Sequence, residues 1–304
     1  MFPDKAPDSL TGFDWGHLTK KYVDTYEQLD RDYSHIYRMS SNRLVQLSRI
    51  GPGCSVIDIG TGTGTSALAA WQAMKSQGKL LAIEPSSMML RRAEARRDLT
   101  GVIFRQGAAK DVAGIASSIG IAGRVDGVIS NFTYYYTYEG RQELHQQIHS
   151  VLAPGGRWAF NITHYLGQLR IRGKVYNHFA PIFERQLRVV AQRYAVQTIE
   201  DVRESESDQF NDTRWEERWL ERAGFTSIEV EAWPLPLTPS EAYRFTIDGF
   251  FRHGSKIGFA PWIMHVPLDR RIQILLDTLT DCTAELDRFP PPYIANFAAA
   301  RPSA

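Results

Sequence analysis

A short apolar run that ends in three closely spaced glycines does most to limit how this chain can fold. It spans Val56–Ser66 and reads VIDIGTGTGTS. The apolar residues are typical of a strand buried on both faces, and the glycines let the backbone turn sharply and approach a ligand. The residues after Gly64 predict a helix. The segment therefore has the form of a strand, a ligand-binding loop and a helix.

The alternation of apolar strands and amphipathic helices continues to residue 163, as expected of parallel strands joined by crossover helices. Strands are predicted at Ser55–Ile59, Leu80–Glu84, Val102–Gln106, Val125–Asn131 and Arg157–Thr163. Helices are predicted at Ser66–Gln77, Ser86–Arg97 and Arg141–Leu152. Two later strands, Thr226–Trp233 and Tyr293–Ala300, complete a predicted sheet of seven. The fold class is therefore α/β.

The flanking segments divide the chain into five predicted parts. They are a helical N-terminal lid (1–50), the core (51–164), a charged helical insertion (165–212), a return to the core (213–238), and C-terminal helices with the final strand (239–304).

Composition excludes several classes of function. The 35 Lys and Arg residues balance 34 acidic ones, so no long-range field gathers nucleic acid or an anionic membrane. The two cysteines show no paired pattern, which favours a reducing compartment, and we expect the cytoplasm. We find neither an export signal nor a run of about 18 apolar residues. The eight histidines have no metal-ligand spacing, so no metal is expected.

Three nucleotide-binding interpretations of the glycine loop compete. A P-loop requires a lysine after its last glycine, and Thr65 stands there instead. A dinucleotide site requires G-x-G-x-x-G, whereas these glycines are spaced G-x-G-x-G, and the carboxylate of Asp58 would repel a pyrophosphate. The same carboxylate suits a ligand with an ammonium and a sulfonium but no phosphate. S-adenosylmethionine is such a ligand.

Together with further motifs, this loop resembles the class I S-adenosylmethionine-dependent methyltransferases, whose fold is a Rossmann-like, seven-stranded, mainly parallel sheet. Glu84 ends the second strand, where the resemblance implies an acid that holds both ribose hydroxyls. The segment Leu152–Gly156, LAPGG, is a further landmark. The resemblance also implies that the last strand is antiparallel and that the N-terminal helices and the insertion close over substrate.

The resemblance assigns cofactor contacts residue by residue. The loop contributes Gly60, Thr61, Gly62 and Gly64 beside Asp58, and the second strand contributes Glu84 with Pro85 and Met88. The family's adenine-binding aspartate is replaced by Ala108, followed by Ala109, so backbone atoms, apolar packing, Lys110 or Asp111 must serve. After the fourth strand, Asn131 and Phe132 would pass behind the methionine portion, while Thr133–Tyr136 would face substrate.

Several aromatic and histidine residues have both a structural and a functional interpretation. Tyr22 and Tyr26 fit the core of a helix bundle or a cover over the cofactor. Tyr134, with Tyr135, Tyr136 and Tyr138, either caps the core or lines the acceptor pocket. His164 follows the fifth strand and is either structural or the base for an acceptor hydroxyl. His253 and His265 are weaker candidates.

These features predict an S-adenosylmethionine-dependent methyltransferase that releases S-adenosylhomocysteine and methylates oxygen, nitrogen or carbon. The aromatic content of the lid segments favours a small, mostly apolar acceptor of the kind found in secondary metabolism. Three alternatives remain: a nucleic-acid methyltransferase, a protein that binds the cofactor without transfer, such as a rearrangement catalyst, and a nicotinamide-dependent oxidoreductase. We expect a monomer or homodimer with no nucleic-acid or membrane partner.

Overall fold

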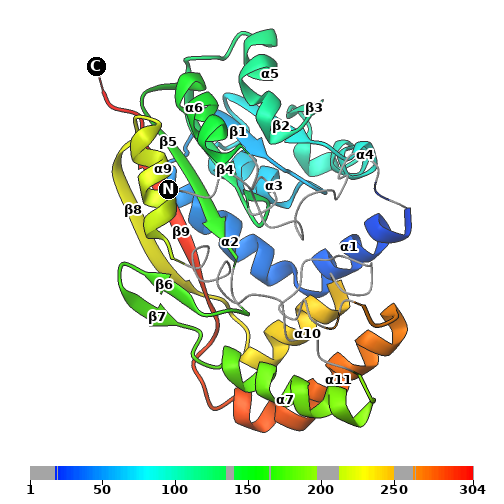
Figure 1. The fold of residues 1–304 in the computed structure, drawn as a ribbon. Helices are drawn as coiled ribbons and strands as arrows, with labels where there is room; N and C mark the ends of the chain where they lie inside the picture. The colour runs from blue at the N-terminus through cyan, green and yellow to red at the C-terminus, as the bar shows by residue number, and fades with distance from the viewer. Residues whose placement is uncertain are drawn as a thin grey trace. The chain divides into compact units, whose positions relative to one another are not determined.

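A central sheet of seven strands organises the computed structural model (Figure 1). The structure describes residues 18, 20–134, 140–163, 166–196, 212–249, 263 and 265–303. The strands are β1 (Ser55–Ile59), β2 (Lys79–Glu84), β3 (Ile103–Gln106), β4 (Val125–Ser130), β5 (Leu152–Ile162), β8 (Thr226–Pro234) and β9 (Tyr293–Ala300). Their order in the sheet is β3-β2-β1-β4-β5-β9-β8.

The pairing of the strands confirms the predicted, mainly parallel α/β fold. β1 pairs in parallel with β2 and β4, β2 with β3, and β4 with β5. Backbone hydrogen bonds between residues 155–156 and Arg301 place the beginning of β5 beside the end of β9, which is the arrangement of antiparallel neighbours. The sequence of β9 matches the predicted final strand residue for residue.

The register of the parallel strands brings two acidic residues to one edge of the sheet. Asp58 pairs with Ala82, and Ile59 pairs with Ile83, so Glu84 lies one residue beyond the end of β1. Ligands of open α/β sheets bind at this carboxyl edge. The strand ends therefore mark where a site is expected.

The chain divides into two compact units. The sheet unit comprises the described residues within 14–163, 214–231 and 296–304, and the helical unit those within 164–213 and 232–295. The helices of the sheet unit are α1 (Lys20–Asp32), α2 (Ser34–Leu47), α3 (Thr65–Ala73), α4 (Ser87–Glu94), α5 (Val112–Ser118), α6 (Arg141–Val151) and α9 (Arg214–Arg222), with short 3-10 turns η2 (Arg97–Leu99) and η3 (Ala109–Asp111).

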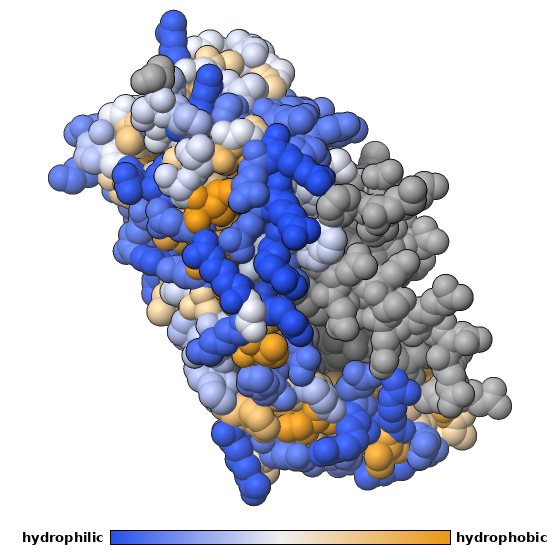
Figure 2. All heavy atoms as spheres, turned by 60° about the vertical axis from the view of Figure 1, so that its left-hand side comes forward, coloured by the Kyte–Doolittle hydropathy of each residue, from blue (hydrophilic) through white to orange (hydrophobic). Residues whose placement is uncertain are grey.

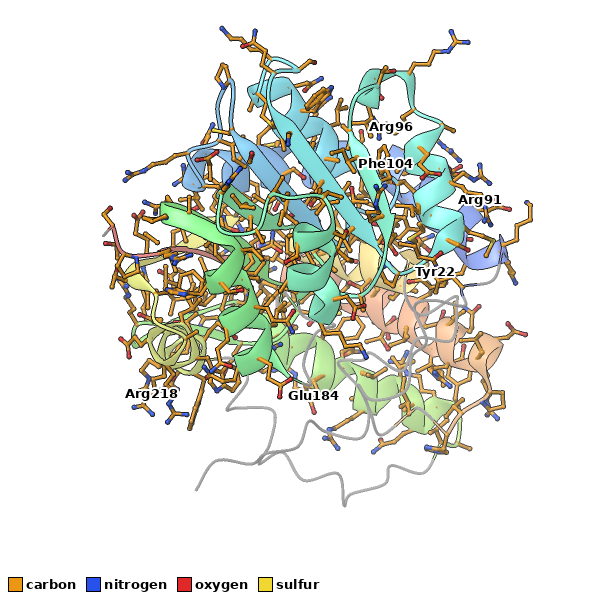
Figure 3. The ribbon with its side chains drawn as sticks, turned by 90° about the horizontal axis from the view of Figure 1, so that it is seen from above. Tyr22, Arg91, Arg96, Phe104, Glu184 and Arg218 are labelled. Atoms are coloured by element: carbon orange, nitrogen blue, oxygen red, sulfur yellow. The ribbon has the colours of Figure 1, made fainter. Side chains whose placement is uncertain are left out.

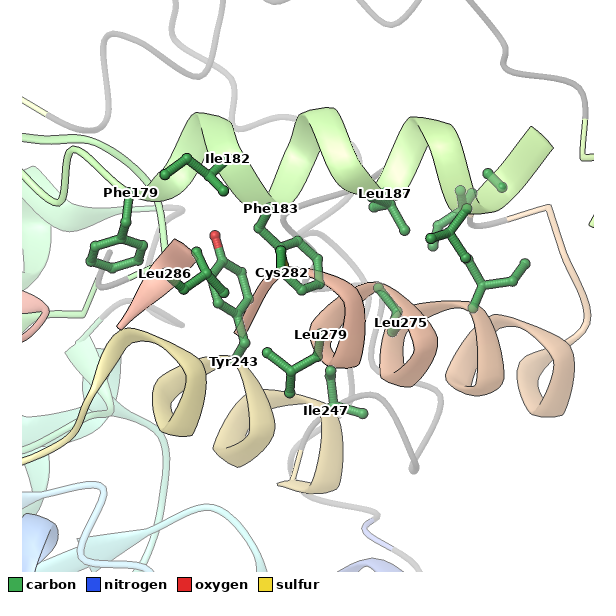
Figure 4. Close-up of a cluster of buried hydrophobic side chains, with 14 of the residues drawn as sticks. Phe179, Ile182, Phe183, Leu187, Tyr243, Ile247, Leu275, Leu279, Cys282 and Leu286 are labelled. Carbon is green, nitrogen blue, oxygen red and sulfur yellow. The ribbon is translucent and has the colours of Figure 1, made fainter. Parts of the chain in front are cut away.

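The helical unit contains α7 (Ala180–Arg193), α10 (Pro239–Gly249) and α11 (Leu268–Leu286) around their own apolar core (Figure 4). The rings of Phe183 and Tyr243 stack in this core with centroids 3.9 Å apart. Ile247, Leu275 and Leu279 extend the same cluster. Burial of these apolar side chains is the main force that holds the three helices together.

A β-hairpin opens the segment for which the sequence predicts mostly helix. β6 (Leu169–Ile171) and β7 (Lys174–Tyr176) pair antiparallel around Arg172 and Gly173, which have φ values of 46° and 88°. Two central residues with positive φ form the tight turns that join neighbouring strands. The alternating sequence LRIRGKVY carries this period-2 signal, which the high charge of the segment obscures.

The helices in the described part of the chain contain polar as well as apolar residues. None of its helices combines the length and hydropathy that crossing a membrane requires. On the face shown in Figure 2, hydrophobic residues lie in small separate patches among hydrophilic ones.

Candidate functional site

The glycine loop after β1 adopts a backbone that other residues disfavour. Gly60, Gly62 and Gly64 all have positive φ, at 72°, 56° and 93°. A Cβ atom on Gly60 would lie only 2.7 Å from Cβ of Thr133, which is too close for any side chain. The Thr133 hydroxyl lies 3.1 Å from the carbonyl oxygens of both Gly60 and Asn131 and shares its one proton between them. The loop and the segment after β4 therefore touch where only glycine fits.

Asp58 has one buried oxygen without a well-formed hydrogen bond. Its side chain is fully buried, and its Oδ2 accepts a 2.7 Å hydrogen bond from the Ser66 hydroxyl at the start of α3. Its Oδ1 and the buried hydroxyl of neighbouring Thr61 form no hydrogen bond of good geometry among the described residues, although Thr61 and Ala67 lie near enough to favour the charged form of Asp58. Burial raises the pKa of Asp58 to about 6. Such orphaned polar atoms are rare in folded proteins and point to a missing partner.

Glu84 holds the glycine loop against the start of α4. It is buried, and its two oxygens accept from the backbone N–H groups of Gly62 and Ser86, each at 2.9 Å. Each carboxylate oxygen can accept a second bond, so both retain capacity for a ligand hydroxyl. Burial, followed by the nearby charge of Asp58, raises the pKa of Glu84 to about 7.

Helix α1 covers this edge with aromatic side chains. Tyr22, which is labelled in Figure 3, packs with Leu18, Val23 and Met89 in a buried cluster to which Tyr26 and Met88 also belong. The ring of Tyr26 lies 3.8 Å from where a Cβ on Gly62 would be. Burial, with a contribution from Glu84, raises the pKa of both tyrosines. Residues of α1, α4 and the glycine loop that were predicted to contact the cofactor therefore lie close together in the structure.

Polar contacts fix α1 over the loop. Asp30 accepts hydrogen bonds from the hydroxyls of Thr63 and Thr65, at 3.1 and 2.9 Å. Arg92 of α4 forms ion pairs with Asp24 and Glu27 of α1, at 3.0 and 3.2 Å. The sequence gives no local signal for these residues, because their partners lie more than 30 positions away in the chain.

We predict that Asp30→Ala lowers the free energy of unfolding by about 1–2 kcal/mol, because two hydrogen bonds to a carboxylate are lost. Denaturant unfolding followed by tyrosine and tryptophan fluorescence measures the change. Asp24→Ala is the matched control on the same helix, and since its ion pair is exposed we expect a smaller loss. Equal losses in the two variants would contradict an anchoring role for Asp30.

At the end of β3, Ala108 stands where the resemblance implies an aspartate. Ala108 and Ala109 are half-buried and lead into η3. The carboxylate of Asp111 accepts from the Ala108 backbone N–H at 3.0 Å, and the Gln106 amide donates to the carbonyl of Pro85 at 3.1 Å. An acidic group therefore lies beside Ala108, although it comes from three residues later.

Asn131 belongs to a buried polar network that joins β4, β5 and α2. Its Oδ1 accepts from the Ser40 hydroxyl at 2.8 Å and from the Asn161 amide at 2.6 Å. Its Nδ2 donates to the Ser41 hydroxyl at 2.9 Å. The side chain is thus used internally and fixes α2 to the strand ends, so any contact of Asn131 with a cofactor would involve its backbone.

Phe132 has an uncommon backbone conformation. Its φ is 55°, in the left-handed region that bulky residues rarely adopt. Its N–H donates to Oδ1 of Asn161 at 2.8 Å, and its ring meets that of Tyr37 edge-on at 5.2 Å. Such strain persists only where the surroundings hold it, and it is frequent at functional sites.

Tyr134 points into the core. Its side chain has no exposed surface, and its hydroxyl donates to Oε1 of Glu216 in α9. Its Oη also lies 2.8 Å from Nε2 of His145 in α6. Burial, followed by the charge of Glu216, raises the pKa of Tyr134 well above its ordinary value. This hydroxyl is not presented to an acceptor, so the structure gives no support to its catalytic interpretation.

Some predicted site residues lie outside the described residues, namely His164, Tyr135, Tyr136, Tyr138 and His253. His265 is described and exposed. Within the described part of the chain, no group of three or more His, Cys, Asp or Glu residues could hold a metal ion.

The fold and the edge at β1 and β2 define a class of proteins that bind a nucleoside-containing cofactor at the carboxyl ends of a parallel sheet. Residues 56–156 match the family described as "Methyltransferase domain". This part of the chain is therefore similar to a methyltransferase domain, and the fold is that of the class I S-adenosylmethionine-dependent methyltransferases.

Solved structures share this fold at low sequence identity. One comes from a complex between the Trm112 methyltransferase activator of Haloferax volcanii and a protein described as a methyltransferase, with 12% identity, a TM-score of 0.51, and coverage of 94% of this chain and 100% of that one. A structure from Galdieria sulphuraria, described as that of a sarcosine dimethylglycine methyltransferase, has 11% identity, a TM-score of 0.49, and coverage of 95% and 94%.

A third structure is phosphoethanolamine N-methyltransferase 2 of Haemonchus contortus in complex with S-adenosyl-L-methionine, with 16% identity, a TM-score of 0.48, and coverage of 94% and 58%. No curated protein sequence matches the chain.

The residues present fit S-adenosylmethionine. Oδ1 of Asp58 forms no hydrogen bond of good geometry and carries the charge that an ammonium group requires. The two oxygens of Glu84 match the spacing of a vicinal diol. At Gly62 the loop leaves room, because the atom nearest to where a Cβ would be belongs to the ring of Tyr26, 3.8 Å away.

Proposed function

We propose that this protein transfers the methyl group of S-adenosylmethionine to a small, mostly apolar organic acceptor. One observation carries the proposal: two buried carboxylates, Asp58 and Glu84, stand at neighbouring strand ends on either side of a loop of three glycines. Burying two acids without a cation nearby is unfavourable, and their raised pKa values reflect this. A ligand with an ammonium, a sulfonium and a diol would satisfy both.

Each residue of the site would then hold one part of the cofactor. Glu84 would accept from the ribose hydroxyls, and Asp58, with the Thr61 hydroxyl, would face the amino-acid ammonium. Met88 and the tyrosines of α1, which cluster beside Glu84, would supply apolar contacts for the adenosyl group. The same side chains would limit the access of water to the bound cofactor.

When bound, S-adenosylmethionine would supply a methyl group carried on a cationic sulfur. The acceptor would attack the methyl carbon in line, and the sulfur would leave as a neutral thioether. The protein contributes chiefly by positioning the acceptor about 3 Å from the methyl carbon. Positive charge on sulfur disappears during transfer, so a dry surrounding does not oppose the reaction. A base is required only for a weakly acidic acceptor, and His164 is the candidate from the sequence.

The class of acceptor is inferred from aromatic side chains near the glycine loop. The rings of Tyr26 and Tyr37 lie 6.1 Å apart, and Tyr37 meets Phe132 at 5.2 Å. This series runs from α1 to the end of β4, where the residues predicted to face substrate begin. Aromatic surfaces favour apolar or flat acceptors over highly charged ones.

The first test separates the cofactor classes by thermal shift. We expect S-adenosylhomocysteine to raise the unfolding temperature of the purified protein and NAD to leave it unchanged, because only a ligand that binds the folded state stabilises it. Stabilisation by NAD alone would overturn the proposal and favour an oxidoreductase.

The second test follows the product by mass spectrometry with a panel of small aromatic and aliphatic acceptors. Transfer adds one methylene to the acceptor and releases S-adenosylhomocysteine. A product of unchanged mass, formed while the cofactor stays intact, would instead favour the non-transferring alternative. Salt-dependent retention on a polyanion column would favour a nucleic-acid substrate.

A further inference from the structure

A buried polar cluster lies beneath the segment that follows β4. Glu216 of α9 is its centre: Oε2 accepts from Arg141 at 3.1 Å, and Oε1 accepts from Tyr134 and lies 2.7 Å from Nε2 of His145. All four residues are buried and belong to the sheet unit. Although burial opposes the charge of Glu216, the Arg141 guanidinium and the His145 and Tyr134 donors hold its pKa below the ordinary value.

The hydrogen bonds of this cluster have defined directions. The indole N–H of Trp158 can only donate, and it donates to Nδ1 of His145 at 3.2 Å. The proton of a neutral His145 therefore sits on Nε2, where it faces Glu216 and Tyr134. The Tyr134 hydroxyl in turn donates its single proton to Glu216. The position of the tyrosine is thus set by a carboxylate and an imidazole that are themselves held from other elements.

The three residues directly before Tyr134 are each held by a hydrogen bond. Asn131 is bonded to α2, the Phe132 N–H to Asn161, and the Thr133 hydroxyl to the Gly60 carbonyl. Phe132 keeps its strained, left-handed conformation between these attachments. Tyr134 adds a further attachment next to Thr133, and we expect that loss of its hydroxyl lets residues 131–134 relax and Thr133 move away from Gly60.

We propose that Tyr134 is a positioning residue, whose buried hydroxyl, held by Glu216 and His145, keeps Thr133 against the glycine loop and so maintains the cofactor site. This inference rests on the proposed function, since it assumes that the glycine loop binds the cofactor. The cluster of α6 and α9 would thus affect the cofactor site, although the side chains of these two helices do not touch that site.

The test is the affinity for S-adenosylhomocysteine, measured by calorimetry at a temperature at which every variant is folded. Tyr134→Phe removes one oxygen and keeps the ring, and we expect it to raise the dissociation constant about fivefold. Tyr243→Phe is the matched control: it too loses a buried hydroxyl, which donates to the Leu166 carbonyl in the helical unit. We expect this control to bind as the wild type does.

A double-mutant cycle tests whether Tyr134 acts through Thr133. Thr133→Val removes the hydroxyl that reaches Gly60, and we expect Tyr134→Phe to weaken binding no further in that background. Should Tyr134→Phe not fold, Glu216→Gln replaces it in the cycle, because it removes the charge that holds the hydroxyl while keeping the shape of the side chain.

Each outcome has one meaning. Unchanged affinity in Tyr134→Phe, equal weakening in Tyr243→Phe, or additive effects in the cycle would overturn the positioning role while leaving the proposed function intact. Failure of the wild type to bind S-adenosylhomocysteine would overturn the proposed function, and the inference with it.

Discussion

Glu84→Ala is expected to raise the dissociation constant of S-adenosylhomocysteine by about ten- to a hundredfold, since the loss of hydrogen bonds to a charged group costs about 1.5–3 kcal/mol. Two effects combine. The ligand diol loses both acceptor oxygens, and the backbone N–H groups of Gly62 and Ser86 lose the carboxylate that holds the loop against α4. Titration calorimetry measures the change.

The control for Glu84→Ala must remove a carboxylate that also accepts from the backbone, but away from the site. Asp126 meets this need, because its Oδ2 accepts from the Ser55 N–H at 2.7 Å at the amino ends of β1 and β4. We expect Asp126→Ala to leave the affinity unchanged. A Glu84→Ala protein that is folded and binds with wild-type affinity would remove Glu84 from the site.

The sequence predicted the sheet and the two acids well because both depend on local patterns. A buried parallel strand is a continuous apolar run, and its carboxyl end must lie at the edge where ligands bind. Asp58 and Glu84 were therefore located by their positions at the ends of β1 and β2. The glycine spacing also predicted that another group lies very close to the loop backbone. In the structure, the Thr133 side chain lies this close to Gly60.

The roles of other residues depend on long-range contacts that no local pattern encodes. Asn131 and Tyr134 come shortly after β4, where residues that face substrate or cofactor are expected. Their polar side-chain atoms nevertheless form hydrogen bonds to α2 and α9. Glu216 gave no signal, because an acid in a charged helix is usually solvated. Its burial depends on Arg141, which lies 75 residues earlier in the chain.

The affinity for S-adenosylhomocysteine is also expected to fall about tenfold as the pH is lowered from 8 to 6, since a carboxyl with a pKa of about 7 passes from mostly ionised to mostly protonated over that range. The ionised form is the better acceptor for the ribose hydroxyls, so binding favours deprotonation of Glu84. Nearby Tyr22 and Tyr26 stay neutral throughout, because their pKa values are raised. Asp58, with a pKa of about 6, adds to the decrease at the acid end.

The unliganded protein should show the opposite trend in stability. The folded-state pKa of Glu84 exceeds its ordinary value of 4.5, so the folded state binds more protons than the unfolded state between about pH 4.5 and 7. The contribution of this carboxyl to stability is therefore present at acid pH and is lost as the pH rises through 7. Between about pH 6 and 7, where the two ranges overlap, ligand affinity and unliganded stability should thus change in opposite directions.

Calorimetric titrations of the wild type and of Glu84→Gln across pH 6 to 8 isolate this carboxyl, because any titration of the ligand is common to both proteins. The variant cannot ionise at this position, and we expect its weaker binding to depend little on pH. A variant with the slope of the wild type would assign the titration to Asp58 or to a group outside the site. Loss of the slope together with loss of affinity would identify Glu84 as the carboxylate that binds the ligand.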